Sequence, residues 1–284
     1  MVLEKIKYNM IKSIPNDYFI ESLRYFIRHK KIANFKNPKT FNEKLGYLKL
    51  YRNPGIRSDL CDKYLVKNYV RKKIGGKYVL DTLYITSEPE SIPFDKLPDS
   101  FIIKATHGSG WNIIVEDKKN TDFKHIIKKC RSFLSMNYYY LGRECQYKNI
   151  EPQIMIENLL KDENGDIPSD YKFFSFNSKV KFIQVDYDRA NDHKRNFYDL
   201  EWNKMDFNLN YPSCNFEIKK PENLSQMIEI SKVLSKGLPF ARIDLYSILN
   251  DIYFGEITLT PENNLGKFMP AKYDKILGEY LSIW

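Results

Sequence analysis

The sequence predicts an α+β protein with largely antiparallel sheets, preceded by a short helical region. Two short β-like runs meet at Asn177-Ser178 and two more meet near Asn250, and both places are typical hairpin signals. Residues 1–50 instead carry apolar side chains at helical spacing. Several hairpins combined with helices indicate an α+β architecture.

The N-terminal elements are predicted to be helices. Asn16-Asp17 supplies the cap of the first helix. The apolar face of that helix would consist of Phe19, Leu23, Phe26 and Ile27. Thr40 and Glu43 have the spacing of a capping box and predict the start of a second helix. A third helix is expected over residues 58–74, because Gly75-Gly76 would end it.

The rest of the chain alternates between strand-like and helix-like segments. Short apolar runs predict strands over residues 78–84, 101–105, 153–160, 171–176, 179–186, 240–247 and 252–258. Helical spacing predicts helices over residues 118–137 and 224–238.

The charge of the chain is distributed unevenly. The composition, 43% hydrophobic and 29% charged over 284 residues, suits a globular protein and excludes a disordered or fibrous one. The first 80 residues carry 19 Lys and Arg against 6 Asp and Glu, whereas the remaining 204 carry 26 against 30. This asymmetry predicts an anionic partner such as phosphate, a uronic acid, a lipid headgroup or nucleic acid.

The sequence also restricts where the protein acts. No segment approaches the roughly 18 apolar residues that cross a bilayer, and residues 1–7 lack the apolar core of a signal peptide. We therefore expect a cytoplasmic protein, whose basic first region makes peripheral contact with the anionic inner face of the membrane. No motif that reads RNA or DNA is present, so nucleic acid is not an expected partner. The four cysteines are far apart and predict reduced thiols.

The last predicted hairpin carries the most informative polar residues. If its register is symmetric about Asn250, Asp244 faces Glu256 and Arg242 faces Thr258, all on one side of the sheet. The opposite, apolar side would carry Ile243, Leu245, Tyr253 and Ile257. Two facing carboxylates repel each other, and Mg²⁺ would reverse that penalty. The alternative is a solvated outer face on which the arginine balances one acid.

A second candidate site follows the strand over residues 101–105. Lys104 interrupts this apolar run, and a buried cation there needs an anion. The Gly108-Ser109-Gly110 segment that follows can offer backbone N–H groups to phosphate oxygens. The pattern is not a P-loop. The alternatives are ordinary turn glycines, with His107 as a hydrogen-bonded loop histidine.

Two further positions could contact a nucleotide. Lys63, at the start of a helix, could point at a phosphate, although the local sequence favours a solvated basic helix. The strand that ends at Glu157-Asn158 could present its backbone to an adenine edge, or it could simply be a core strand that leaves the sheet.

A cluster of charges follows the strand over residues 179–186. Asp186 and Asp188 form an Asp-x-Asp pattern, by which many glycosyltransferases hold a nucleotide-sugar through Mn²⁺. The cations near it suit a substrate that bears a carboxylate. These cations are Arg189, His193, Lys194 and Arg195. The alternative is a charged surface loop.

Several motifs follow one another in a defined order. They are residues 41–45, 62–64, 104–110, 112–115, 170–174, 193–199, 242–244 and 253–261. In this order the chain resembles the ATP-grasp superfamily. More narrowly, it is similar to the teichuronopeptide-biosynthesis (TupA-like) family of bacterial surface-polysaccharide proteins, over roughly residues 36–280.

The resemblance implies a fold and three regions. The fold would be ATP-grasp, in which two α+β subdomains with largely antiparallel sheets clasp ATP. A basic helical region (1–58) would precede an N-terminal lid subdomain (59–155) and a C-terminal metal and catalytic subdomain (156–284). The α/β domain that usually precedes this fold would be missing or shortened.

The resemblance also implies the roles of individual residues. Lys63 and Lys104 would bind the α- and β-phosphates of ATP, and Lys172 the γ-phosphate. Arg242 would steady the transferring phosphoryl group or the tetrahedral intermediate. A mobile loop over the phosphates would contain His107, Gly108, Ser109 and Gly110. The backbone that binds adenine would be that of Glu157, Asn158 and Leu159. The ligands of Mg²⁺ would be Asp244, Glu256 and Thr258, the last standing where many ATP-grasp proteins have asparagine.

The implied activity is that of an ATP- and Mg²⁺-dependent carboxylate–amine ligase, which forms an amide through an acyl phosphate. The partners would be an amino acid or another amine and a uronic-acid-containing sugar nucleotide or glycan of a bacterial surface polysaccharide. The cations Arg189, His193 and Arg195 would contact that substrate. The alternative function is a glycosyltransferase that uses Asp186 and Asp188.

Overall fold

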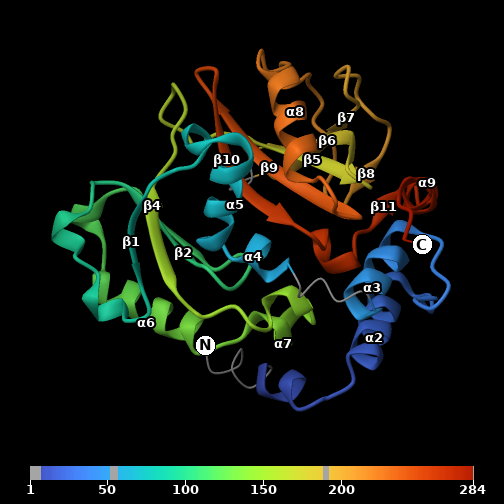
Figure 1. The fold of residues 1–284 in the computed structure, drawn as a ribbon, viewed down its shortest axis with the longest axis horizontal. Helices are drawn as coiled ribbons and strands as arrows, with labels where there is room; N and C mark the ends of the chain where they lie inside the picture. The colour runs from blue at the N-terminus through green and yellow to red at the C-terminus, as the bar shows by residue number, and fades with distance from the viewer. Residues whose placement is uncertain (1–7, 52–56, 188–191, 284) are drawn as a thin grey trace. The chain divides into compact units, whose positions relative to one another are not determined.

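The computed structural model describes residues 8–51, 57–187 and 192–283 of the chain (Figure 1). The described residues form two compact units. The first unit draws on residues 1–11 and 55–168, and the second on residues 12–54 and 169–284. Every strand pair within the described residues is antiparallel, and the predicted α+β architecture is confirmed.

These units are bounded differently from the predicted regions, which met at residues 58 and 155. Residues 12–54 belong to the second unit because Phe41 and Leu45 pack into the same core as Phe176 and Phe240. Residues 156–168 belong to the first unit because the strand over residues 154–158 pairs on both sides with strands of that unit.

The first unit contains a four-stranded sheet in the order β1-β4-β2-β3. Its strands are β1 (Thr82–Thr86), β2 (Phe101–Ala105), β3 (Asn112–Val115) and β4 (Ile154–Asn158). Its helices are α4 (Ser58–Cys61), α5 (Leu65–Ile74), α6 (Phe123–Leu134) and α7 (Tyr138–Gly142). The core on one face joins Phe101, Ile103 and Ile156 of the sheet to Ile126 and Cys130 of α6.

The predicted helix over residues 58–74 is divided into α4 and α5. Asp62 separates the two because its carboxylate accepts hydrogen bonds from the N–H groups of Tyr64 and Leu65, at 2.8 and 3.0 Å. An acid that accepts N–H groups in this way starts a new helix. Gly75 follows α5 with a positive φ of 102°, as predicted for a glycine that ends a helix.

The second unit contains a five-stranded sheet in the order β10-β9-β5-β6-β7 and a two-stranded sheet of β11 and β8. The strands of the larger sheet are β5 (Asp170–Phe176), β6 (Lys179–Tyr187), β7 (Lys194–Tyr198), β9 (Phe240–Ile248) and β10 (Asp251–Thr258). The smaller sheet comprises β8 (Asn208–Leu209) and β11 (Phe268–Met269). The helices are α2 (Asp17–His29), α3 (Phe41–Tyr51), α8 (Leu224–Leu234) and α9 (Lys272–Tyr280).

The two faces of the larger sheet are used differently. On one face, α8 packs against β5, β6 and β9 (Figure 1). The hydroxyls of Ser175 and Ser235 lie 2.7 Å apart. On the other face, one end of the strands carries an aromatic core, which residues of α3 and α9 complete. Its sheet residues are Phe174, Phe176, Phe182, Phe197 and Phe240. The other end of this same face carries the polar residues described below.

The N-terminal helices begin where the sequence predicts. The side chain of Asn16 caps α2 by accepting from the N–H of Phe19, and Thr40 and Glu43 form a reciprocal capping box at the start of α3. The predicted apolar face of α2 is present, but it is not the side that packs on the core. The buried residues of α2 are Ile20, Glu21 and Tyr25, whereas Phe19, Leu23, Phe26 and Ile27 are about half exposed. The core-facing side is defined instead by Tyr25, which packs on Phe35.

The hairpin of β9 and β10 contains a bulge that sets its register. The turn is formed by Leu249 and Asn250, both with positive φ, and a regular ladder from this turn would place Asp244 opposite Gly255. The irregularity at Gly255 shifts the pairing by one residue, so that Glu256 lies opposite Asp244. The predicted facing of 244 with 256, and of 242 with 258, is therefore confirmed.

The bulge also explains one wrong assignment. Tyr253 lies before the bulge and pairs with Tyr246, which shares the face of Asp244, so Tyr253 is not on the apolar side. Residues 194–198 form β7, so the alternative of a charged surface loop does not hold for them. In the part of the chain that the structure describes, no helix has the length and apolar character needed to span a bilayer. Cys61, Cys130 and Cys214 are buried.

Replacement of Gly255 by alanine should destabilise the second unit. The new Cβ would lie 3.0 Å from the carbonyl oxygen of Asp244 and 3.1 Å from the ring of Tyr246. We expect a loss of about 1 kcal/mol in the free energy of unfolding, measured by urea denaturation. Gly76→Ala is the matched control, because no atom lies within 4 Å of its added Cβ. Equal stability of the two variants would contradict the assigned role of the bulge.

Candidate active site

A row of polar residues crosses four strands of the larger sheet. Glu256 of β10 lies opposite Asp244 of β9, which lies opposite Lys172 of β5, which in turn lies opposite Gln184 of β6. Residues directly opposite in an antiparallel sheet share a face, so the four side chains leave the sheet on the same side. Asp244, Lys172 and Gln184 are buried, whereas Glu256 is partly exposed.

Arg242 bridges the two facing carboxylates. Its Nε and Nη2 donate to the two oxygens of Asp244, both at 2.7 Å, and Nη2 also donates to Oε1 of Glu256 at 3.0 Å. Burial opposes the charge of the guanidinium, but the two carboxylates outweigh this and raise the pKa of Arg242. Thr258 donates its hydroxyl to the same Oε1 of Glu256 at 3.0 Å. The repulsion between the two acids is thus offset by one guanidinium.

Lys172 lies among three carboxylates. Its Nζ contacts Asp170 directly and lies 3.3 Å from Oδ2 of Asp244 and 3.6 Å from Oδ2 of Asp186. Both Lys172 and Asp186 are almost fully buried. The ammonium therefore connects the pair of acids on β9 and β10 to a second group of charges on β6 and β7.

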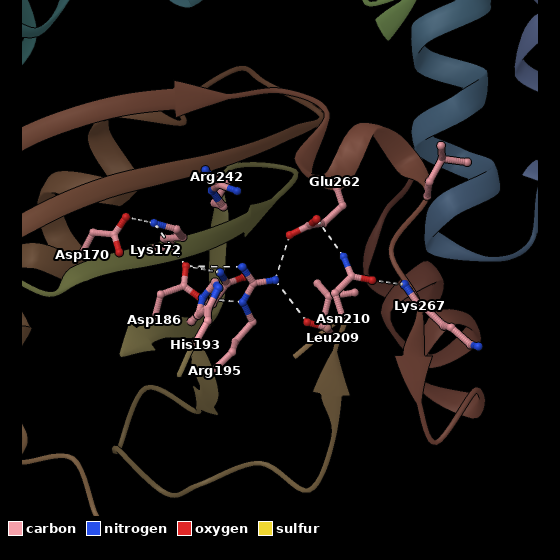
Figure 2. A network of polar contacts seen from close by, with 12 residues as sticks. Asp170, Lys172, Asp186, His193, Arg195, Leu209, Asn210, Arg242, Glu262 and Lys267 are labelled. Carbon is pink, nitrogen blue, oxygen red and sulfur yellow. Dashed lines mark hydrogen bonds and ion pairs between the residues drawn. The ribbon is translucent and has the colours of Figure 1, made fainter. Parts of the chain in front are cut away.

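Asp186 is the centre of that second group (Figure 2). It accepts from Nε of Arg195 at 2.6 Å, from the amide of Gln184 at 3.0 Å and from Nε2 of His193 at 3.0 Å. Burial alone would raise the pKa of its carboxyl, but Arg195 and Lys172 hold that pKa well below its usual value. Asp186 is therefore compensated by groups of the protein itself, with Arg195 and Lys172 as its cations.

The predicted substrate contacts lie in this network. Arg195 also donates from Nη1 to Glu262 at 2.8 Å and to the carbonyl of Leu209 at 3.2 Å. The ring of His193 packs on that of Tyr211 with centroids 3.7 Å apart. Asp188 and Arg189, which were predicted to act with them, lie outside the described residues. The structure thus brings His193 and Arg195 together on Asp186, and their role towards a substrate stays a prediction.

The network continues to the N-terminal helices of the same unit. Asn210 donates to Glu262 at 2.8 Å (Figure 2). It also accepts from Nη2 of Arg28 at 2.6 Å. Further along, Nζ of Lys49 pairs with Glu21 at 2.7 Å and donates to Asn264 at 3.1 Å, and all three residues are buried. Helices α2 and α3 thereby hold the segment that follows β10.

Sequence reasoning missed several members of this network, among them Asp170, Gln184, Asn210 and Glu262. For Asp170 a signal was available: it stands two residues before Lys172 at the start of an apolar strand, the same spacing as Arg242 and Asp244. Asn210 and Glu262 had no such signal, because their contacts join segments 52 residues apart.

The facing acids of the last hairpin suit a divalent cation. Mg²⁺ is usually bound by one or two carboxylates together with waters and substrate phosphates. Asp244 and Glu256 supply two carboxylates, and Thr258 supplies a neutral oxygen beside them. Two carboxylates and one hydroxyl fit Mg²⁺ that keeps ligands from outside the protein. Across the residues that the structure describes, no group of three or more His, Cys, Asp or Glu side chains is placed to hold a metal.

The first unit carries a second compensated charge cluster. Lys104 of β2 and Lys67 of α5 both pair with the buried carboxylate of Glu157 on β4, Lys104 at 2.7 Å. Lys67 also donates to the carbonyl of Leu80 and the hydroxyl of Thr82. Burial would raise the pKa of Glu157, but the two lysines lower it. The anion that Lys104 was predicted to need is thus Glu157, and Lys67 was missed.

The glycine loop after β2 is anchored to Lys63. The Nζ of Lys63 donates to the carbonyl of Gly108, and its N–H donates to the carbonyl of Thr106 at 3.1 Å. A Cβ at position 108 would lie 2.7 Å from the ring of Trp111, and Gly110 has a positive φ of 73°. Both glycines are thus required by the local backbone and packing. Ser109 and Gly110 are exposed.

His107 is held inside the first unit. It is 1% exposed, and its Nε2 lies 3.1 Å from the carbonyl of Phe133. Burial lowers the pKa of its imidazole. These contacts match the predicted alternative of a hydrogen-bonded loop histidine. At the end of β4, Asn158 is exposed and Leu159 is half-buried.

The comparison with protein families identifies the chain. A family model described as TupA-like ATPgrasp matches residues 43–282, which is most of its length. The protein belongs to the TupA-like ATP-grasp family and has the ATP-grasp fold. No curated protein gives a significant match.

Solved structures with a similar fold include ATP-grasp enzymes. The D-alanine–D-alanine ligase of Bacillus anthracis is 20% identical, with a TM-score of 0.46, over 78% of this chain and 66% of that chain. The D-alanine–D-alanine ligase of Helicobacter pylori is 19% identical, with a TM-score of 0.44, over 85% and 69%. The ADP complex of PurK, an N5-carboxyaminoimidazole ribonucleotide synthetase, is 16% identical, with a TM-score of 0.46, over 78% and 52%. The chain therefore spans about half to two thirds of the length of these proteins.

The lowered pKa of Glu157 predicts a dependence of stability on pH. Because its folded pKa lies below the unfolded value, Glu157 contributes stability above about pH 4.3, and this contribution is lost as the pH falls through the folded pKa. Glu157→Gln should cost about 3 kcal/mol at neutral pH, since two lysines lose their counter-charge.

Thermal denaturation from pH 7 to pH 3 measures this effect. The difference in melting temperature between the wild type and Glu157→Gln should shrink as the pH falls below about 4.3, which is the pKa of a glutamate side chain in the unfolded chain. The exposed Glu163→Gln is the matched control and should show a small difference at every pH. A difference for Glu157→Gln that does not change with pH would show that the carboxylate is not ionised in the folded protein.

Proposed function

We propose that the protein is an ATP- and Mg²⁺-dependent ligase that joins a carboxylate to an amine. The observation that carries the proposal is the pairing of Asp244 with Glu256 across β9 and β10, bridged by Arg242, in a chain of the TupA-like ATP-grasp family. The ATP-grasp ligase PsnB has been solved with Mg and ADP, and the D-alanine–D-alanine ligase of Bacillus anthracis with ATP.

The charges of the second unit support a cation there. Among the described residues, direct ion pairs on this sheet join five carboxylates, which are Asp170, Asp186, Asp244, Glu256 and Glu262. The permanent cations in these direct pairs are Lys172, Arg195 and Arg242, whereas Arg28 reaches Glu262 only through Asn210. Within the direct pairs the acids exceed the permanent cations by two, a charge that one divalent ion would balance. Buried charge without compensation is costly, so this excess favours the uptake of Mg²⁺.

The protein residues would bind and orient the reactants. In the first unit, Lys63 and Lys104 would contact the α- and β-phosphates, the loop of His107 and Gly108–Gly110 would cover them, and the backbone of residues 157–159 would bind adenine. Lys104 retains donors for this role, because its ammonium has three N–H groups and its side chain is 20% exposed.

In the second unit, Asp244, Glu256 and Thr258 would hold Mg²⁺, which when bound neutralises phosphate charge and polarises the γ-phosphoryl group. Lys172 would contact the γ-phosphate by exchanging one of its carboxylate partners. Arg242 would stabilise the negative charge that develops on the transferring phosphoryl group.

The reaction would proceed in two steps. An oxygen of the substrate carboxylate attacks the γ-phosphorus of ATP, the bond to the β-phosphate oxygen breaks, and an acyl phosphate and ADP result. The amine nitrogen then attacks the acyl carbon, phosphate leaves, and the nitrogen loses a proton to give the amide. Such phosphoryl transfer depends on positioning and charge neutralisation, which the lysines and Arg242 are suited to supply.

The finer proposal concerns the substrates, and it rests on the family resemblance. We propose that the carboxylate belongs to a uronic acid of a bacterial surface polysaccharide, carried by a sugar nucleotide or a glycan, and that an amino acid or another amine is joined to it. His193 and Arg195, together with Arg189, would contact this substrate. The glycosyltransferase alternative is not favoured, because Asp186 already has Arg195, His193 and Lys172 as partners.

Removal of either acid of the last hairpin should abolish turnover. We expect Asp244→Asn and Glu256→Gln to reduce phosphate release from ATP by at least about a hundredfold, because both alter the site where charge develops. The assay should screen amino acids together with uronic acids or their nucleotide-linked forms.

The matched control is Asp251→Asn, an exposed acid of the same hairpin, which should keep full activity. Circular dichroism should show that all three variants are folded. If either acid variant released phosphate at the rate of the wild type, the metal assignment would be overturned.

Thermal shift should separate the two functions. A ligand that binds only the folded state raises the melting temperature. At a ligand concentration of a hundred times its dissociation constant, the added free energy of unfolding is about 2.7 kcal/mol. We expect ATP with Mg²⁺ to stabilise the protein and a UDP-sugar with Mn²⁺ to leave it unchanged. Stabilisation by the UDP-sugar alone would favour the glycosyltransferase.

A further inference from the structure

Helix α2 carries an exposed apolar stripe, which we define as Phe19, Leu23, Phe26 and Ile27. Their exposed fractions are 54%, 45%, 49% and 59%. The positions follow the spacing i, i+4, i+7 and i+8, so the four side chains lie on one face of the helix. Contiguous apolar patches of this kind on a protein surface mark sites of interaction.

The stripe is not the face by which α2 packs on its own unit. That role belongs to Ile20, Glu21 and Tyr25, which are buried, with Tyr25 on Phe35 and Glu21 paired to Lys49. At the end of the helix, Arg28 is hydrogen-bonded to Asn210 and to the carbonyl of Leu265. The helix is therefore anchored to its unit on one side while it presents the stripe on another.

The exposed surface around the stripe is basic. The exposed basic residues between positions 18 and 39 are Arg28, Lys30, Lys31, Lys36 and Lys39. This segment contains a single acid, Glu21, and that acid is buried. A further apolar side chain, Ile32, is 86% exposed directly after the two lysines. Asp17 opens the helix, and Glu43 accepts from the N–H groups of Asn34 and Lys39, so the surface combines apolar area with an excess of positive charge.

We propose that α2 binds the surface of an anionic phospholipid bilayer. The stripe would enter the boundary between headgroups and acyl chains, while the lysines after it would contact the headgroup phosphates. A helix of 13 residues is too short to cross the hydrocarbon, but an amphipathic helix with basic flanks is suited to lie in this interface. The charge complementarity favours an anionic membrane over a second copy of this basic chain.

The contacts of α2 would then position the candidate active site. Arg28 holds Asn210, and Asn210 holds Glu262, which belongs to the charge network of the larger sheet. A membrane-bound α2 would therefore keep this network close to the lipid surface. The inference does not depend on the reaction that the site performs.

Vesicle co-sedimentation with the full chain tests the inference. We expect binding to vesicles of phosphatidylcholine mixed with phosphatidylglycerol, little binding to phosphatidylcholine alone, and release at high salt, which screens charge. Phe19→Ser combined with Phe26→Ser should weaken binding by at least about tenfold, because two exposed aromatic groups no longer enter the interface. Lys30→Glu combined with Lys31→Glu should weaken it to a similar extent.

Matched controls separate the helix from the general charge and apolarity of the protein. Val233→Ser removes an exposed apolar side chain from α8, and Lys128→Glu combined with Lys129→Glu makes the same change of charge on α6. Both should bind like the wild type, and all variants should keep the wild-type melting temperature. The proposal would be overturned if binding did not depend on lipid charge, or if the α2 variants bound as well as the controls. It would also be overturned if the protein dimerised and the Phe19→Ser and Phe26→Ser variant did not, because the stripe would then bind a second copy of the chain.

Discussion

Compensation of buried charge is the constraint on which the candidate site depends. Asp244 and Glu256 face each other across two strands, and Arg242 is what makes that arrangement tolerable without a ligand. Lys172 then has to serve three carboxylates, one of which is also held by Arg195. Because every group has partners on neighbouring strands, the charges hold the strand ends in register as much as they prepare a site.

The first unit also compensates buried charge, but there the excess charge is positive. In the described cluster of the first unit, one acid, Glu157, pairs with two lysines, Lys67 and Lys104, so the cluster keeps an excess of positive charge. The ion pairs of the second unit instead keep an excess of negative charge. A positive excess suits phosphate, and a negative excess suits a metal ion. The two charge clusters therefore differ in the kind of ligand each would accept, as the proposed binding of ATP with Mg²⁺ requires.

The structure also shows how a local irregularity decides chemistry. Without the bulge at Gly255, the two-residue turn would pair Asp244 with glycine and send Glu256 to the apolar face. The predicted register was right for the acids because two departures from symmetry cancel: the turn is centred half a residue earlier than assumed, and the bulge adds one residue back. The same bulge makes the assignment of Tyr253 wrong.

The sequence by itself determined the elements whose signals are local. Helix caps at Asn16 and Thr40, the hairpin turns, the α+β class and the alternation that puts Arg242 with Asp244 on one face all follow from residues a few positions apart. The ordered motifs also sufficed to recognise the family.

Only the tertiary structure decided which partners those residues meet. Lys67 reaches Glu157, and Asn210 reaches Glu262, across long stretches of chain that no spacing rule connects. In α2, periodicity revealed an apolar stripe but not that Ile20 and Tyr25 would take the buried side. The physical reason is the same in each case: burial and charge pairing are settled by what other segments bring to a position, and that depends on the folded chain.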